Sequence, residues 1–186
     1  MKSLPDQIEI YNKGLGCKGY DLIKDLKEVR DLKKQGVPEP DFLERCICNR
    51  RRHQQRLRKK AVASAVKALT NHLEELSQCE DFECLYDIIY DMIARKKTNE
   101  CTFISFSTVY DTALRIAYSF DKDNLMPRKY VYVHRHLRKE AREILGGVKI
   151  ENNCRIPRSA FETKEKAFVK LNSTKIEDFL CVRHLI

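Results

Sequence analysis

The sequence has no long apolar run and no cysteine pair spaced as CxxC. A membrane-spanning helix needs about 18–20 consecutive apolar residues, and no stretch approaches that length. The opening MKSLPDQIEIYNKG lacks the apolar segment of a secretion signal. Without such a signal, the eight cysteines indicate reduced thiols in a cytoplasmic protein with no membrane partner.

No complete catalytic or metal-binding motif is present, neither a phosphate-binding P-loop nor a Ser–His pair. Cys46 and Cys48 lie two positions apart in a predicted helix, which turns their thiols about 200° away from each other. Cys79 and Cys84 are also spaced more loosely than the cysteine pairs of structural zinc sites. We therefore predict no metal and no other cofactor, and consider a binding protein more plausible than an enzyme.

Apolar residues recur at spacings of three and four, which predicts a mainly α protein. One long helix is expected from a cap at Asp41 to Leu76, and another is expected to open at the capping-box layout Thr108–Asp111. YVYVH, residues 130–134, is the one strand-like stretch. The sequence thus predicts a single-domain helical bundle of about six to eight helices with at most one short strand pair. Residues 1–40 would form an N-terminal helical extension and residues 41–186 the core.

Positive charge is concentrated in two segments. Residues 45–60, RCICNRRRHQQRLRKK, carry +8 with no acid, and residues 128–142, RKYVYVHRHLRKEAR, carry +5. Because the whole chain carries +9, the remaining residues are acidic, with a net charge of −4. Charge localised in this way favours a polyanionic partner more strongly than a high isoelectric point alone.

Three explanations fit residues 45–60: a phosphate-binding surface, a dock for an acidic partner, and a solvated helix face. We favour the first, because a phosphate backbone relieves the repulsion between like charges at helical spacing and releases counterions. The predicted nucleic-acid-binding residues, from both basic segments, are Arg45, Arg50, Arg51, Arg52, Arg56, Arg58, Lys59, Lys60, Lys129, Arg135, Arg138 and Arg142.

His134 and His136 would face the same side of a strand, where they fit a phosphate site or, less well, two ligands of a metal. Asp111 stands one helical turn before Arg115, which is typical of an ion pair. The alternative makes Asp111, His134 and His136 the catalytic candidates of an enzyme with a basic groove.

Three stretches carry a resemblance: HQQRL at residues 53–57, TVYDTALRIAYSF, and YVYVHRHLRKEAREILG. Together they resemble an uncharacterised family of bacterial helical proteins with a TVYDxALRI helix and a VYxH segment. That layout is in turn similar to the helix-hairpin-helix element of DNA glycosylase-like domains. The corresponding turn, CTFISFS, contains no glycine, so the resemblance implies a helical fold and no glycosylase chemistry.

The sequence therefore predicts a basic helical protein that binds DNA or RNA through residues 45–60 and 128–142. Two alternatives remain open. One is a DNA-repair or nuclease-type enzyme that uses Asp111, His134 and His136. The other is a non-catalytic module that docks an acidic protein, and the sequence also leaves room for a homo-oligomer.

Overall fold

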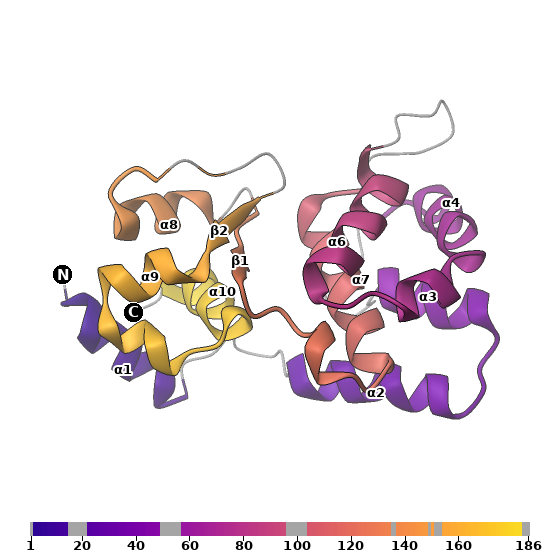
Figure 1. The fold of residues 1–186 in the computed structure, drawn as a ribbon, viewed down its shortest axis with the longest axis horizontal. Coiled ribbons are helices and arrows are strands. Elements are labelled where there is room, and N and C mark those ends of the chain that lie inside the picture. Colours follow the sequence, from indigo (N-terminus) through magenta and orange to yellow (C-terminus); the bar gives the residue numbers. More distant parts are fainter. Residues whose placement is uncertain are drawn as a thin grey trace. The chain divides into compact units, whose positions relative to one another are not determined.

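The computed structural model describes residues 2–14, 22–48, 57–95, 104–134, 137–148, 150 and 154–183. These residues form ten α-helices and one antiparallel pair of short strands (Figure 1). The predicted mainly α fold and the single short strand pair are confirmed. The helices are more numerous than the predicted six to eight, because segments expected to be continuous are broken.

The chain divides into two compact units. Unit 1 combines Met1–Tyr20 with Pro127–Ile186, and unit 2 is Asp21–Met126. The sequence placed a division at residue 40, between an extension and a core. The structure instead groups residues 21–40 with unit 2 and the N-terminal helix with the C-terminal third of the chain.

Unit 2 is built around one buried helix. Its elements are α2 (Leu22–Lys34), α3 (Glu39–Ile47), α4 (Lys59–Thr70), α5 (Leu73–Ser77), α6 (Phe82–Tyr90), a π-helical turn (Asp91–Arg95), α7 (Phe106–Ser119) and a 3-10 turn (Asp123–Leu125). Helix α7 packs against α2, α3 and α6 and is buried on nearly all sides. It therefore forms the centre of the unit 2 core.

The predicted continuous helix from Asp41 to Leu76 is wrong. Helix α3 already starts at Glu39 and ends at Ile47, where Cys48 adopts extended backbone angles (φ −119°, ψ 90°). Helix α4 begins only after Arg58, which is also extended (φ −67°, ψ 136°), and it stops before Asn71. Asparagine is a poor helix former, which fits the end of α4 before Asn71. The apolar spacing alone suggested one helix where the described residues form separate ones.

The start of α7 also differs from the prediction. Its N-cap is Ser105, whose Oγ accepts the backbone N–H of Thr108 at 3.4 Å, so Thr108 lies inside the helix. Thr108 is buried, and its backbone oxygen accepts the Thr112 hydroxyl at 2.7 Å. The Ser-x-x-Thr spacing provides the cap, although the acid usual at the third helical position is absent.

Replacing Ser105 by Ala should destabilise the protein by about 1 kcal/mol, because a helix N-cap is lost in the core of unit 2. Ser105→Asp should retain most of the stability, since aspartate is an equally good N-cap. Urea unfolding of the two variants checks the assignment. Equal stability of Ser105→Ala and the wild type would contradict it.

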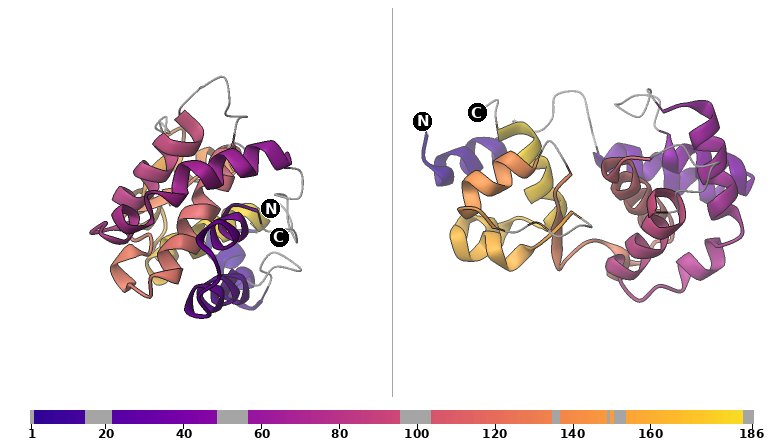
Figure 2. Two further views of the ribbon diagram at one scale, coloured as in Figure 1. Left: turned by 90° about the vertical axis from the view of Figure 1, so that its right-hand side faces the viewer. Right: turned by 90° about the horizontal axis from the view of Figure 1, so that it is seen from above.

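Unit 1 surrounds the two strands with helices. Its elements are α1 (Leu4–Asn12), β1 (Tyr130–Tyr132), α8 (Arg138–Leu145), β2 (Arg155–Pro157), α9 (Arg158–Lys164), a 3-10 turn (Lys166–Lys170) and α10 (Ser173–Val182). Val131 pairs with Ile156 at the centre of the strand pair. The N-terminal helix α1 lies beside α10 (Figures 1 and 2). The rings of Tyr11 and Phe179 meet edge to face there, with their centroids 5.7 Å apart.

The strand predicted within residues 130–134 is confirmed and is present as β1. The helix that follows it ends at Gly146, which adopts a left-handed conformation with φ 73° and donates its N–H to the Arg142 carbonyl at 2.9 Å. A side chain with a Cβ is strained at that angle, which explains the glycine at this position.

Candidate nucleic-acid interface

The first basic segment begins in α3 and ends in α4. Five of the predicted phosphate-binding residues lie outside the residues that the structure describes: Arg50, Arg51, Arg52, Arg56 and Arg135. The described members of the first segment are Arg45 at its start and Arg58, Lys59 and Lys60 at its end. These two ends have different environments.

Arg58, Lys59 and Lys60 form the start of α4, and all three are exposed. The first turn of α4 contains no acid, and no side chain caps its backbone N–H groups. No residue in the described part of the chain forms an ion pair with any of the three. A helix N-terminus already carries a partial positive charge, so cations there are unfavourable in isolation. Within the described residues, the start of α4 is therefore a positive site without a counter-charge.

The opposite face of α4 fixes this start in place. Ala61, Val62, Ala65 and Leu69 are buried, and α4 packs against α3. Burial of this apolar stripe offsets the electrostatic cost of the basic first turn. The three cations are consequently held on a firmly packed helix.

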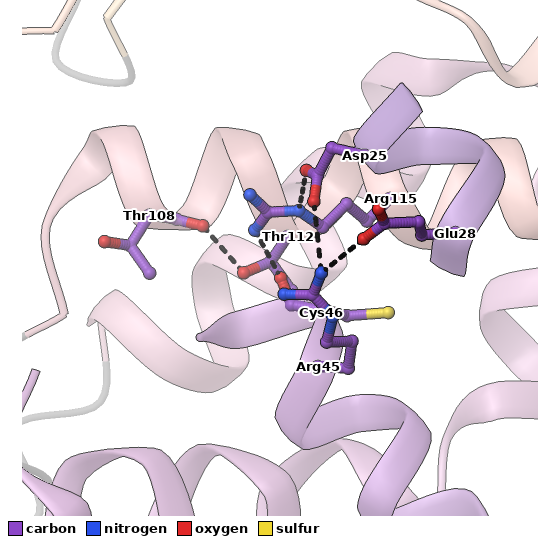
Figure 3. A network of polar contacts seen from close by, with 7 residues as sticks. All are labelled: Asp25, Glu28, Arg45, Cys46, Thr108, Thr112 and Arg115. Atoms are coloured by element: carbon purple, nitrogen blue, oxygen red, sulfur yellow. Dashed lines mark hydrogen bonds and ion pairs between the residues drawn. The ribbon is translucent and has the colours of Figure 1, made fainter. Parts of the chain in front are cut away.

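Arg45 is engaged inside unit 2 (Figure 3). Its guanidinium lies 2.8 Å from Glu28 and 3.7 Å from Asp25, both on α2. Asp25 is 5% exposed and also pairs with the buried Arg115 at 2.8 Å. The positive charge of Arg45 therefore balances carboxylates of its own unit, and we do not count it in the interface.

A cleft of about 700 Å³ lies beside Arg45. Four carboxylates line it, together with Arg45 and Cys48: Glu28, Asp31, Asp41 and Glu44. Among the described lining residues the carboxylates outnumber the single cation, and such a surplus of negative charge repels phosphate. Arg58, Lys59 and Lys60 are not among these described lining residues.

The second basic segment belongs to unit 1, and its residues serve different purposes. Lys129 and Arg142 are exposed. Arg138 is half-buried and donates to the Cys154 sulfur at 3.1 Å, and Lys139 lies 3.8 Å from Glu143 on the surface of α8. Of the predicted phosphate-binding residues in this segment that the structure describes, Lys129 and Arg142 are the exposed ones.

The three catalytic candidates do not form a described site. Asp111 is half-buried on α7 in unit 2, whereas His134 belongs to unit 1, where its Nε2 lies 3.6 Å from Glu177. His136 lies outside the described residues. Asp111 and His134 do not line the acidic cleft. In the described part of the chain, no group of three His, Cys, Asp or Glu side chains is placed to hold a metal ion.

The sequence did not indicate the role of Arg115. Its Nε donates to Asp25 at 2.8 Å and its Nη1 donates to the Cys46 carbonyl at 2.7 Å, while its side chain is 1% exposed (Figure 3). The signal was present in TVYDTALRIAYSF, where an arginine interrupts a segment that is apolar around most of the helix. Such an arginine needs a buried acid, but the sequence does not say which one.

No protein-family model, curated protein or solved structure matches the chain. The resemblance to the TVYDxALRI family therefore stays a prediction. None of the helices in the described residues combines the length and apolar character required to cross a membrane.

Proposed function

We propose that the protein binds nucleic acid through the start of α4 and the arginine run that precedes it. The observation that carries this proposal is the exposed Arg58–Lys59–Lys60 start of α4, which has neither a cap nor an acid in its first turn. Lys129 and Arg142 in unit 1 would provide further phosphate contacts.

The chemistry of the α4 start suits a phosphate group. First-turn N–H groups of a helix point toward a bound anion, and the helix dipole favours its charge. Arginine and lysine add charge-assisted hydrogen bonds to phosphate oxygens. The acidic cleft of unit 2 disfavours phosphate and so restricts where a polyanion approaches.

Contacts of this kind read the backbone and not the bases. The expected binding is therefore weakly sequence-dependent and strongly salt-dependent, because each neutralised phosphate releases counterions. In the free protein the three cations at the start of α4 lower the stability of the helix. In the complex the same cations attract the phosphates of the nucleic acid. Charge placed at the expense of local stability is typical of a binding surface.

The test is binding of the full chain to labelled duplex DNA, single-stranded DNA and RNA at two salt concentrations. The triple variant Arg58→Gln, Lys59→Gln, Lys60→Gln should bind about 10- to 100-fold more weakly near 0.1 M salt. Its slope of log affinity against log salt should be smaller by about 3, one for each lost phosphate contact.

A matched control removes the same charge elsewhere. Lys166, Lys170 and Lys175 are exposed in unit 1 and have no ion-pair partner among the described residues. Changing these three to Gln should leave the affinity nearly unchanged. Equal losses in the two triple variants would show that only net charge matters and would contradict a site at α4.

Stability separates a lost contact from a damaged fold. Glutamine is a good helix former, and removing cations from a helix N-terminus relieves repulsion with the dipole. The α4 variant should thus be as stable as the wild type or slightly more stable in urea, while it binds less. If the wild type ignores all three nucleic acids at low salt, the proposal fails and an acidic protein becomes the partner to seek.

A further inference from the structure

Cys79 and Cys84 of unit 2 lie in direct contact, although their spacing in the sequence is not that of a regular metal site. The Cys84 thiol donates to the Cys79 sulfur at 3.1 Å. Cys79 stands in the connection between α5 and α6, and Cys84 is in the first turn of α6. A disulfide requires a sulfur separation of about 2 Å, so a shift of roughly 1 Å joins the two.

The backbone around both sulfurs is held by hydrogen bonds. Asp81 is the N-cap of α6 and accepts the Cys84 N–H at 2.9 Å. The Glu80 carbonyl accepts Asn124 Nδ2 at 2.6 Å, and the Ser77 carbonyl accepts Lys122 Nζ at 2.6 Å. The connection is thus tied to the segment after α7, which keeps the two thiols facing each other.

The two thiols differ in access to reagents. Cys84 is exposed, whereas Cys79 is only 6% exposed. Burial, together with the hydrogen bond and the negative potential of Cys84, raises the pKa of Cys79 to about 12. A dissolved disulfide therefore reaches Cys84 first. Once Cys84 is in a mixed disulfide, its contribution to the high pKa of Cys79 disappears and Cys79 becomes a better nucleophile.

We propose that Cys79 and Cys84 are a redox-active dithiol that forms a reversible intramolecular disulfide by exchange with a small-molecule disulfide. Cys84 loses its proton and attacks one sulfur of the reagent, whose S–S bond breaks and releases one thiol. Cys79 then loses its proton and attacks the Cys84 sulfur, which releases the second thiol. The two cysteines lose two electrons in total, and the reagent is reduced to two thiols.

Cystamine is a suitable probe, because its positive charges match the carboxylates of Glu75 and Asp81 near the pair. The reduced full chain is treated with cystamine under native conditions, quenched with an alkylating reagent and digested. Trypsin yields residues 68–95 as one peptide, since no lysine or arginine lies between Lys67 and Arg95. This peptide contains Cys79 and Cys84 and no other cysteine.

The expected product is this peptide without alkyl groups and lighter by two hydrogen atoms. Glu80 and Glu83 lie between the two cysteines, so a Glu-specific protease cuts there. The fragments should stay joined until a reductant is added. A wild-type peptide that remains alkylated at both cysteines, while other cysteine peptides react, would overturn the proposal.

Two variants separate the roles of the sulfurs. Cys79→Ser should accumulate a cysteamine adduct on Cys84 at least about tenfold above the wild type, because no neighbouring thiol resolves it at high effective concentration. Cys84→Ser should leave Cys79 unmodified. A stable adduct on Cys84 at the same level in the wild type and in Cys79→Ser would refute the exchange. The wild-type digest gives the primary result even if a variant folds poorly.

Discussion

Replacing Arg115 by Met should destabilise unit 2 by about 3–5 kcal/mol, the largest electrostatic effect expected in this protein. The guanidinium is buried, and it satisfies Asp25 at 2.8 Å and the Cys46 carbonyl at 2.7 Å. Methionine fills a similar volume but donates no hydrogen bond. Asp25, itself 5% exposed, would lose the ion pair at 2.8 Å, and Arg45 at 3.7 Å lies farther from it.

The measurement is the midpoint of urea unfolding, and the slope of the transition is compared between the variants and the wild type. Arg58→Met makes the same chemical change at an exposed position and should alter the stability by no more than about 0.5 kcal/mol. The double variant Arg115→Met, Asp25→Leu removes both charges and should be more stable than Arg115→Met alone, because no carboxylate stays buried. A double variant that is less stable by the sum of both single losses would argue against the ion pair as the cause.

The parts of the fold that followed from the sequence are those with a local signal. Apolar residues at spacings of three and four predicted a mainly α protein, and α6 with its π-helical extension is one of the helices that carry this pattern. The strand at residues 130–132 was predicted as well, but its partner β2 was not, because residues 155–157 are too few to show alternation.

The parts that did not follow depend on contacts between distant residues. The apolar spacing of residues 41–76 predicted one continuous helix. Like charges within this range disfavour a helix, and α3 and α4 pack against each other as separate elements. Arg45 was predicted to bind phosphate because its partner Glu28 could not be recognised from the sequence. Glu28 is on α2, 17 positions earlier. Rules for neighbouring charges reach only three or four residues along a helix and do not find such a pair.

The candidate site shows the same division. Arg58, Lys59 and Lys60 were identified from composition alone, and the structure adds that they start a helix without a cap. Cys79 and Cys84 were considered as a metal pair and dismissed for their spacing. A spacing of five does not place two thiols together on a regular helix, but here a helix end, a turn and a new helix start lie between them. Only the turn at Glu80 and Asp81 brings the sulfurs within 3.1 Å.

The core of unit 1 depends on a group of rings that meet edge to face. Phe168 lies between Phe161 and Phe179, with ring centroids 5.5 Å and 5.7 Å away. All three side chains are fully buried. Phe168 stands in the 3-10 turn Lys166–Lys170, and such a short turn has little stability of its own. Its ring therefore anchors the connection between α9 and α10.

Phe168→Ala should destabilise unit 1 by about 3–5 kcal/mol, from the lost burial and the cavity that remains. The two edge-to-face contacts add to this loss, so a value near the upper end is expected. Amide exchange should report reduced protection in α9 and α10, together with a lower urea midpoint of the full chain. Exchange is the more specific readout, because it assigns the loss to these two helices.

Val169 provides the control for this substitution. It is the next residue in the same turn, but it is 56% exposed, so Val169→Ala should change the stability by less than about 0.5 kcal/mol. Phe168→Leu keeps an apolar side chain in place and should lose less than Phe168→Ala, because the cavity is smaller. If alanine at position 168 cost no more than alanine at position 169, the ring cluster would not be the core that holds α9 and α10 together.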